Sequence, residues 1–166
     1  MLREEGKDLA IVLHNIRSIH NVGSVFRTAD GAGASTVYLS GYTPGPHDRF
    51  DRLRKDFQKT ALGAENHVQW ERVSGLTTLV SRLKKDGWTI VGVEQDSCAV
   101  SYRAIPQASK ACLIMGNEVR GLSSSAKSLC DILIEIPMRG SKESLNVSVA
   151  AGIALYAVAD QIFEHS

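Results

Sequence analysis

Short apolar runs that alternate with segments of helical periodicity constrain the fold of this chain more than any other feature. The runs with the length of a buried strand lie at residues 9–13, 36–39, 88–93, 111–115 and 132–136. Between them, apolar residues recur with the spacing of one helix face, at 21–33, 49–60, 76–87 and 145–163. This alternation predicts an α/β fold with a mostly parallel sheet flanked by helices.

Length and composition predict a single domain over residues 1–166 in a reduced, cytoplasmic setting. A net charge of +1 gives no overall field that would attract nucleic acid or a membrane. The charged start, residues 1–7, lacks the apolar core of a signal peptide, and no apolar run is long enough to span a bilayer. Cys98, Cys112 and Cys130 lack the CxxC spacing of a zinc site.

The first candidate for chemistry is the polar segment at residues 14–30, which leaves the first strand and enters a helix capped by Asn21. Gly23 would let another group approach the backbone closely, and Arg27 lies four residues later on the same face. The fork of donors on Arg27 is suited to phosphate. The alternative is an ordinary capped helix in which Arg27 pairs with Asp30.

Two further candidates follow the last two predicted strands. One strand stops at Gly116, and Glu118 follows two residues later. Glu118 could be favoured there by the dipole at the N-terminus of a helix. Alternatively, it lies at the rim of a turn whose backbone contacts a ligand. The other strand ends at residues 136–138, and Ser144 and Asn146 then open the last helix. Strand ends that lead into helix starts are common ligand sites in α/β proteins, although either residue could simply cap the helix.

Basic residues form a fourth candidate, on the predicted helix 49–60 opposite its apolar side chains. They are Arg52, Lys55 and Lys59. A solvated helix face is one interpretation, and a modest phosphate-binding patch is the other. A second set of cations that could contact RNA instead is Arg17, Arg139 and Lys142.

Several familiar motifs are missing from the sequence. No GxGxxG follows the first strand, and neither a GxxxxGK[ST] loop nor a GxSxG elbow occurs. His20 and His47 have no partners at metal-ligand spacing, so we expect no metal site.

In this order, the three strand-end segments resemble motifs 1, 2 and 3 of the SpoU/TrmH-type branch of the SPOUT superfamily of RNA methyltransferases. Motif 1 is matched by Asn21, Gly23 and residues 27–30, and motif 2 by residues 116–118 and Gly121. Motif 3 is matched by residues 136–138 and 144–148. The likeness extends over essentially the whole chain.

The resemblance implies a C-terminal deep trefoil knot and a homodimer with the active site near the subunit interface. Larger relatives carry an extra RNA-binding domain, for which this chain has no room, so we expect no separate RNA-binding domain here. It implies S-adenosylmethionine as the cofactor, without metal. The residues that would bind the cofactor are Met115, Gly116, Asn117, Ile136, Met138, Ser144, Leu145 and Asn146. The last helix is apolar on nearly every face, which by itself predicts burial in the core or against a partner.

The implied reaction is methyl transfer to a ribose 2′-hydroxyl of tRNA or rRNA, with tRNA favoured because a compact chain suits a small substrate. The implied catalytic residues are Arg27, Asn21, Glu118, Ser144 and Asn146. A guanidinium stays protonated in proteins, so we expect Arg27 to grip phosphate and stabilise the oxyanion rather than act as a base. The alternative is that the chain is a non-catalytic, RNA-binding relative that kept the fold. A site that had lost its activity would not need Arg27, Glu118 and residues 144–146 together, so the enzyme is favoured.

Overall fold

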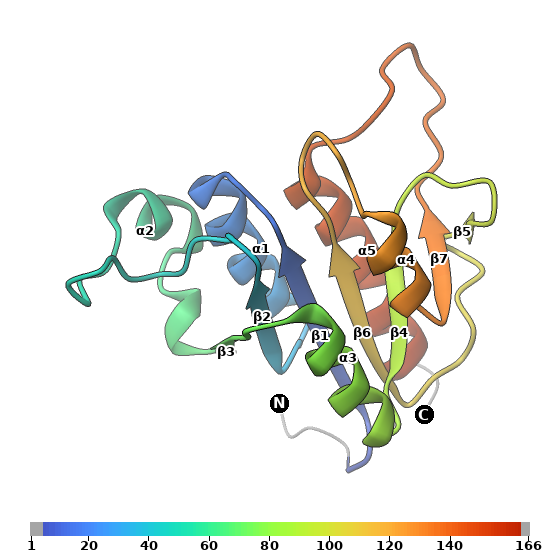
Figure 1. The fold of residues 1–166 in the computed structure, drawn as a ribbon, viewed down its shortest axis with the longest axis horizontal. Helices are drawn as coiled ribbons and strands as arrows, with labels where there is room; N and C mark the ends of the chain where they lie inside the picture. The colour runs from blue at the N-terminus through green and yellow to red at the C-terminus, as the bar shows by residue number, and fades with distance from the viewer. Residues whose placement is uncertain (1–4, 164–166) are drawn as a thin grey trace.

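Seven strands form one sheet at the centre of the computed structural model, which describes residues 5–163 (Figure 1). The strands are β1 (Asp8–His14), β2 (Thr36–Ser40), β3 (Gln69–Arg72), β4 (Thr89–Val93), β5 (Val100–Ser101), β6 (Lys110–Met115) and β7 (Ile132–Glu135). Their order across the sheet is β3-β2-β1-β6-β4-β7-β5, and every pairing between them is parallel. The carboxyl ends of all strands therefore meet at one edge.

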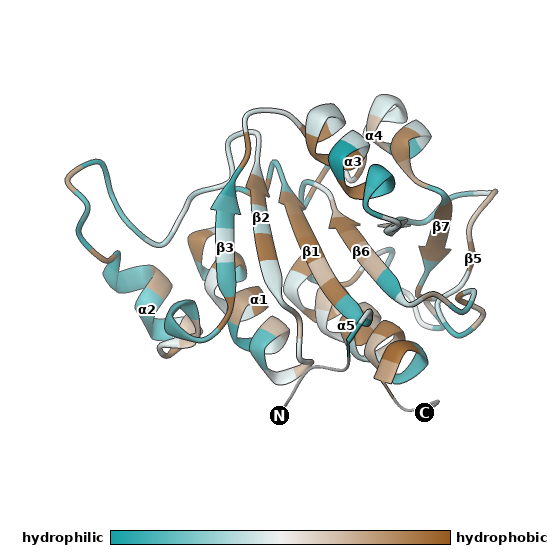
Figure 2. Cartoon of the chain, turned by 90° about the horizontal axis from the view of Figure 1, so that it is seen from below, coloured by the Kyte–Doolittle hydropathy of each residue, from teal (hydrophilic) through white to brown (hydrophobic). Residues whose placement is uncertain are grey.

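Helices cover both faces of this sheet (Figure 2). They are α1 (Ile19–Gly31), α2 (Lys55–Ala61), the 3₁₀ turn η1 (Ala64–Asn66), α3 (Leu76–Lys85), α4 (Ser124–Leu129) and α5 (Val147–Phe163). Helices α3 and α4 lie on one face, and α1 and α5 lie on the other with α2 packed beside α1. The α/β fold with a parallel sheet is confirmed.

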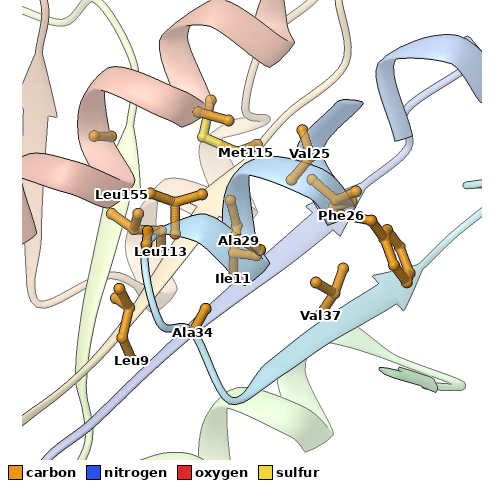
Figure 3. Packing of buried hydrophobic residues seen from close by; sticks show 14 of the residues in the cluster. Leu9, Ile11, Val25, Phe26, Ala29, Ala34, Val37, Leu113, Met115 and Leu155 are labelled. Atoms are coloured by element: carbon orange, nitrogen blue, oxygen red, sulfur yellow. The ribbon is translucent and has the colours of Figure 1, made fainter. Parts of the chain in front are cut away.

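The central strands are apolar on both sides because both faces of the sheet are covered. In β1, Leu9, Ile11 and Leu13 belong to the core cluster under α1 and α5, whereas Ala10 and Val12 belong to the cluster under α3 and α4. Figure 3 shows Leu155 of α5 packed near Leu113 and Met115 of β6 in the first cluster. The two packed layers fix the strand ends as a rigid frame.

The predicted helix 49–60 is wrong in its first half, because α2 begins only at Lys55. The Asp48 carboxylate accepts the backbone N–H of Phe50 at 2.8 Å and that of Arg52 at 3.1 Å. Asp51 has a φ of 58°. A side chain that binds nearby amides in this way competes with helix formation, so residues 48–52 form a turn instead.

The start of α1 also differs from the prediction. Ser18 is the N-cap, and its hydroxyl accepts the backbone N–H of Asn21 at 3.3 Å, so Asn21 lies within the first turn. Gly33, with a φ of 77°, ends the segment as predicted.

The cysteines Cys98, Cys112 and Cys130 are free thiols. Within residues 5–163, no helix has both the length and the apolar character needed to cross a bilayer.

Candidate functional site

The loops that follow β6, β4 and β7 surround one cavity at the carboxyl edge of the sheet. These three strands are neighbours in the sheet, so their loops meet although they are distant in sequence. The cavity is lined by all the predicted cofactor residues except Asn146, namely Met115, Gly116, Asn117, Ile136, Met138, Ser144 and Leu145. Glu118, predicted at a rim, lines it as well.

Sequence reasoning missed the other part of the lining. The missed residues are Val93, Glu94, Gln95, Val119 and Ala150, whereas Gly121 and Val147 belong to motifs 2 and 3 but were not assigned to the cofactor. Val93–Gln95 come from the end of β4, which carries no recognisable motif. Only the strand order, with β4 between β6 and β7, brings this segment to the site. The sequence pattern does not reveal that order.

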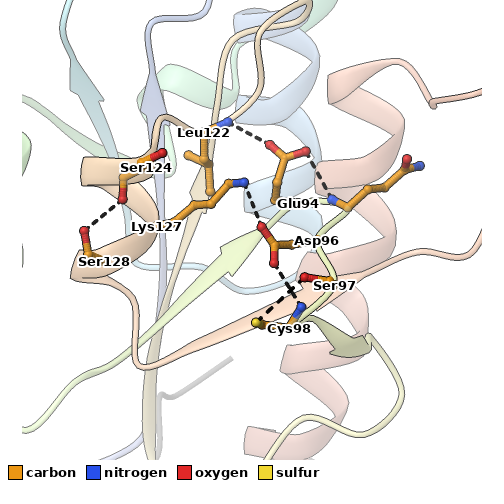
Figure 4. A network of polar contacts seen from close by, with 9 residues as sticks. Glu94, Asp96, Ser97, Cys98, Leu122, Ser124, Lys127 and Ser128 are labelled. Carbon is orange, nitrogen blue, oxygen red and sulfur yellow. Dashed lines mark hydrogen bonds and ion pairs between the residues drawn. The ribbon is translucent and has the colours of Figure 1, made fainter.

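Glu94, which lines the cavity, holds the turn at Gly121 and Leu122 in place (Figure 4). Its carboxylate accepts the backbone N–H of Leu122 at 2.7 Å and that of Gln95 at 3.1 Å. Gly121 has a φ of 64°, and a Cβ there would collide with the Glu94 carboxylate. A side chain at Gly121 is therefore excluded on both conformational and steric grounds.

Gly116 is required by the protein's own backbone rather than by a ligand. A Cβ on Gly116 would lie 2.5 Å from the carbonyl carbon of Gly121 and 2.6 Å from the backbone nitrogen of Leu122. The loop closes on itself here, and the N–H of Gly121 donates to the carbonyl of Asn117 at 2.9 Å. The close approach predicted at this strand end is real, but the approaching group is the loop.

The charges in the lining are of one sign. Glu94 and Glu118 contribute carboxylates, and no lysine or arginine of the described chain lines the cavity. The remaining walls are largely apolar, with Met115, Ile136 and Leu145 among them. Such a cavity suits a ligand that combines a flat apolar part with a positive charge.

Glu118 also anchors the loop that precedes α1. Its carboxylate accepts the backbone N–H of Arg17 at 3.0 Å and of Ser18 at 2.9 Å, and the side-chain amide of Asn21 at 3.4 Å. Burial disfavours the charge on Glu118, but the hydrogen bonds from Ser18 and Arg17 outweigh it and hold its pKa below the usual range. The carboxylate stands at a helix N-terminus, as one interpretation expected, although the helix is α1.

A chain of hydrogen bonds joins the three sequence motifs. The Asn21 side-chain amide donates to Glu118, and the Asn146 side-chain amide donates to Oδ1 of Asn21 at 3.2 Å. Asn146 also caps α5, because its carbonyl oxygen accepts the N–H of Ser148 at 2.8 Å. The helix-capping interpretation of Asn146 is therefore confirmed, and its role in a ligand site stays a prediction. Ser144 lines the cavity and makes no hydrogen bond within residues 5–163.

Arg27 is not part of this chain of contacts. It is exposed on α1, and its side chain forms no hydrogen bond or ion pair with any described residue, so the alternative Arg27–Asp30 pair is absent. It follows Asn21 by six residues, about 9 Å along the helix. At Gly23 the approaching group is α2, because a Cβ there would collide with the Thr60 hydroxyl.

The predicted RNA-binding cations differ in their surroundings. Arg52 forms an ion pair with Asp48 at 2.8 Å, and hydrogen bonds from Arg52 lower the pKa of Asp48 to about 2. Lys59 pairs loosely with Asp56 at 3.5 Å, and Lys55 is exposed. Phe50 is 62% exposed, with the guanidinium of Arg52 5.0 Å from its ring. This segment lies at the far end of the molecule beyond α1 (Figure 1).

The other predicted RNA-binding residues are Arg17, Arg139 and Lys142. All three are exposed at the carboxyl edge of the sheet, Arg17 after β1 and the other two in the loop between β7 and α5.

Comparison with known proteins gives consistent matches. The profile of the SpoU rRNA methylase family matches residues 8–156. A putative TrmH family tRNA/rRNA methyltransferase of Staphylococcus haemolyticus is 35% identical over 155 residues, which is 93% of this chain and 59% of that protein. Its Staphylococcus aureus counterpart is 34% identical and is covered to 60%. The chain thus spans about three fifths of the length of these curated relatives.

Two solved structures share the fold. The A. aeolicus TrmH/SpoU tRNA modifying enzyme has a TM-score of 0.82 at 29% identity, over 95% of this chain and 77% of that one. An AdoMet-bound rRNA methyltransferase from Sinorhizobium meliloti has a TM-score of 0.83 at 27% identity, over 94% of this chain and 57% of that one.

Proposed function

We propose that this chain, which belongs to the SpoU/TrmH family of RNA methylases, transfers a methyl group from S-adenosylmethionine to a ribose 2′-hydroxyl of tRNA or rRNA. The observation that carries the proposal is the cavity at the ends of β6, β4 and β7. The hydrogen-bond chain through Glu118, Asn21 and Asn146 adjoins that cavity and supports the proposal.

The cavity suits S-adenosylmethionine by the charge and the apolar character of its lining. When bound, this cofactor supplies an electrophilic methyl group on a positively charged sulfonium. The carboxylates of Glu94 and Glu118, with no cation in the described lining, favour such a charge. Met115, Ile136 and Leu145 provide apolar contacts for an adenine ring. The presence of the same cofactor in the Sinorhizobium relative adds support.

The remaining residues are assigned to the RNA. Glu118 holds the Arg17–Ser18 loop, and Asn21 and Asn146 offer amide groups beside the cavity. Arg27, which has no partner among residues 5–163, would bind a phosphate and stabilise the developing oxyanion. Preorganised donors of this kind contribute most when they need no rearrangement during the reaction.

A homodimer would explain why Arg27 lies outside the hydrogen-bond chain of Glu118, Asn21 and Asn146. The outer face of α5 exposes Val149 and Tyr156, each 49% exposed, and the Tyr156 hydroxyl lies 3.0 Å from where a Cβ on Gly31 of α1 would be. Apolar groups on such a face favour burial against a second copy. We propose that the dimer covers α1 and α5 and completes the site with Arg27.

The experiment that tests this function is mass spectrometry of tRNA and rRNA nucleosides from a strain without the gene. Loss of one 2′-O-methylated nucleoside, restored by the wild-type gene but not by an Arg27→Ala variant, is expected. An unchanged profile would favour the non-catalytic RNA-binding alternative. We favour tRNA over rRNA and expect the reaction to take place in the cytoplasm.

A further inference from the structure

A second hollow adjoins the cavity just described. It lies at the carboxyl ends of β1, β2 and β6 and is lined by Arg17, Tyr42, Pro44, Asn117, Val119 and Arg120. Asn117 and Val119 line both cavities, so a single loop separates the two spaces. A group bound in the hollow would therefore be a direct neighbour of a group bound in the cofactor cavity.

The wall of this hollow is rigid. Asn117 is only 9% exposed, and its side-chain amide donates to the Asn15 carbonyl and to the Tyr42 hydroxyl, both at 3.0 Å. Its carbonyl oxygen accepts the N–H groups of Val119 and Arg120, each at 2.9 Å. All hydrogen-bonding groups of the Asn117 side chain are thus used to fix the loop.

Tyr42 is held at both ends but remains open to solvent. Its backbone N–H donates to the Asn15 side chain at 3.3 Å, and its hydroxyl accepts from Asn117. It is nevertheless 58% exposed. An aromatic ring whose orientation is fixed in advance loses little conformational freedom when a flat group stacks on it.

Two cations line the same hollow as this ring. Arg17 and Arg120 are exposed, and neither guanidinium has a hydrogen bond or ion pair with another residue in the described part of the chain. No acidic residue lines the hollow, in contrast to the cofactor cavity. The backbone of Arg17 is fixed by Glu118, so at least one cation is attached to an ordered loop.

From these contacts we propose that the hollow is a nucleotide subsite, in which the base at the methylation site stacks on Tyr42 and its phosphate binds Arg17 and Arg120. A fixed aromatic face beside two free guanidiniums is the combination that binds an unpaired nucleotide. Pro44 and Val119 add apolar contacts to a base and none to a simple anion. The inference rests on the proposed methylation of RNA.

The test compares Tyr42→Leu, Tyr42→Phe and the double variant Arg17→Gln/Arg120→Gln in steady-state methylation of RNA. Tyr42→Leu should lower kcat/KM about 5- to 150-fold, the range for loss of one stacked base. Tyr42→Phe keeps the ring but loses the hydroxyl that accepts from Asn117, so it should lower kcat/KM less than Tyr42→Leu does. The double arginine variant should reduce the slope of log KM against log salt by about 0.7 per lost phosphate contact.

Control measurements distinguish a failure of the nucleotide subsite from a failure of the proposed RNA methylation. Lys85→Gln removes an exposed charge at the opposite edge of the sheet, at the end of α3, and should leave kcat/KM and the salt slope unchanged. Calorimetry should give wild-type cofactor affinity for every variant. Wild-type kcat/KM in Tyr42→Leu overturns the subsite, as does a loss explained by weaker cofactor binding.

If the wild-type protein methylates no RNA, the proposed function fails and the subsite is tested by RNA affinity alone. Equal affinity in wild type and Tyr42→Leu then overturns it. If the arginines bind inorganic phosphate while Tyr42→Leu has no effect on RNA, the hollow is an anion site and the proposal is wrong.

Discussion

Replacing Glu118 with Gln should weaken the connection between β6 and the start of α1. The substitution keeps the size of the side chain but removes the charge. Oε1 and Oε2 of Glu118 both accept from the Arg17 amide at 3.0 Å. In Gln, one of these oxygens is replaced by an NH₂ group, which cannot accept a hydrogen bond from that amide. The Ser18 amide and the Asn21 side chain keep a neutral acceptor in place of a charged one.

The expected loss is about 1–2 kcal/mol of unfolding free energy, since Arg17 loses one of its two contacts and the remaining three contacts to the side chain become weaker in a partly exposed site. For a domain of this size, that loss lowers Tm by about 2–8 °C. The measurement is thermal unfolding followed by circular dichroism. Glu143→Gln is the matched control, because it removes an exposed carboxylate in the loop before α5.

The difference between wild type and Glu118→Gln should depend on pH. The pKa of Glu118 is lowered in the folded state. The stabilisation is therefore fully present above its unfolded value of about 4.5 and is lost as the pH falls toward the folded value. The Tm difference should be large at pH 7 and should shrink below pH 4.5. Equal Tm values at pH 7, or a difference that persists unchanged in acid, would show that the Glu118 charge does not stabilise the loop before α1.

Three further predictions concern the cofactor, the RNA and catalysis. Gly116→Val should abolish cofactor binding measured by calorimetry and should lower Tm as well, because the new side chain meets the backbone of Gly121 and Leu122; unchanged Tm would contradict this packing. Charge reversal of Arg52, Lys55 and Lys59 should reduce the slope of log K for RNA binding against log salt by about 0.7 per lost contact. Arg52 should contribute least, because it is paired with Asp48. An unchanged slope would indicate that RNA binds elsewhere, with Arg17, Arg139 and Lys142 as the candidates. Arg27→Ala should lower single-turnover methyl transfer at least about 10²–10³-fold with cofactor affinity unchanged, and Arg27→Lys should be nearly as damaging; equal rates would remove Arg27 from the site.

The sequence predicted the parallel α/β core well because buried strands such as 111–115 are apolar on both faces. It missed β3 and β5, whose exposed residues carry no strong pattern, and it extended α2 through the Asp48 turn. The trefoil knot stays a prediction.

The cavity lining was predictable where motifs mark strand ends, as at Gly116 after β6 and Ile136 after β7. It was not predictable at Glu94 or Tyr42, which reach their positions through strand order and through contacts with residues distant in sequence. Sequence patterns describe local periodicity, and these two residues depend on tertiary contacts instead.

Methyl transfer to a ribose hydroxyl is tested most directly with the purified protein. The protein is incubated with S-adenosylmethionine that is labelled in the methyl group and with RNA from a strain that lacks the gene. Alkaline hydrolysis cleaves RNA through the free 2′-hydroxyl, so a methylated ribose blocks cleavage at its own phosphodiester. Methyl transfer to ribose should place the label in an alkali-resistant dinucleotide. Label in a mononucleotide carrying a methylated base, or no transfer to any RNA, would contradict it.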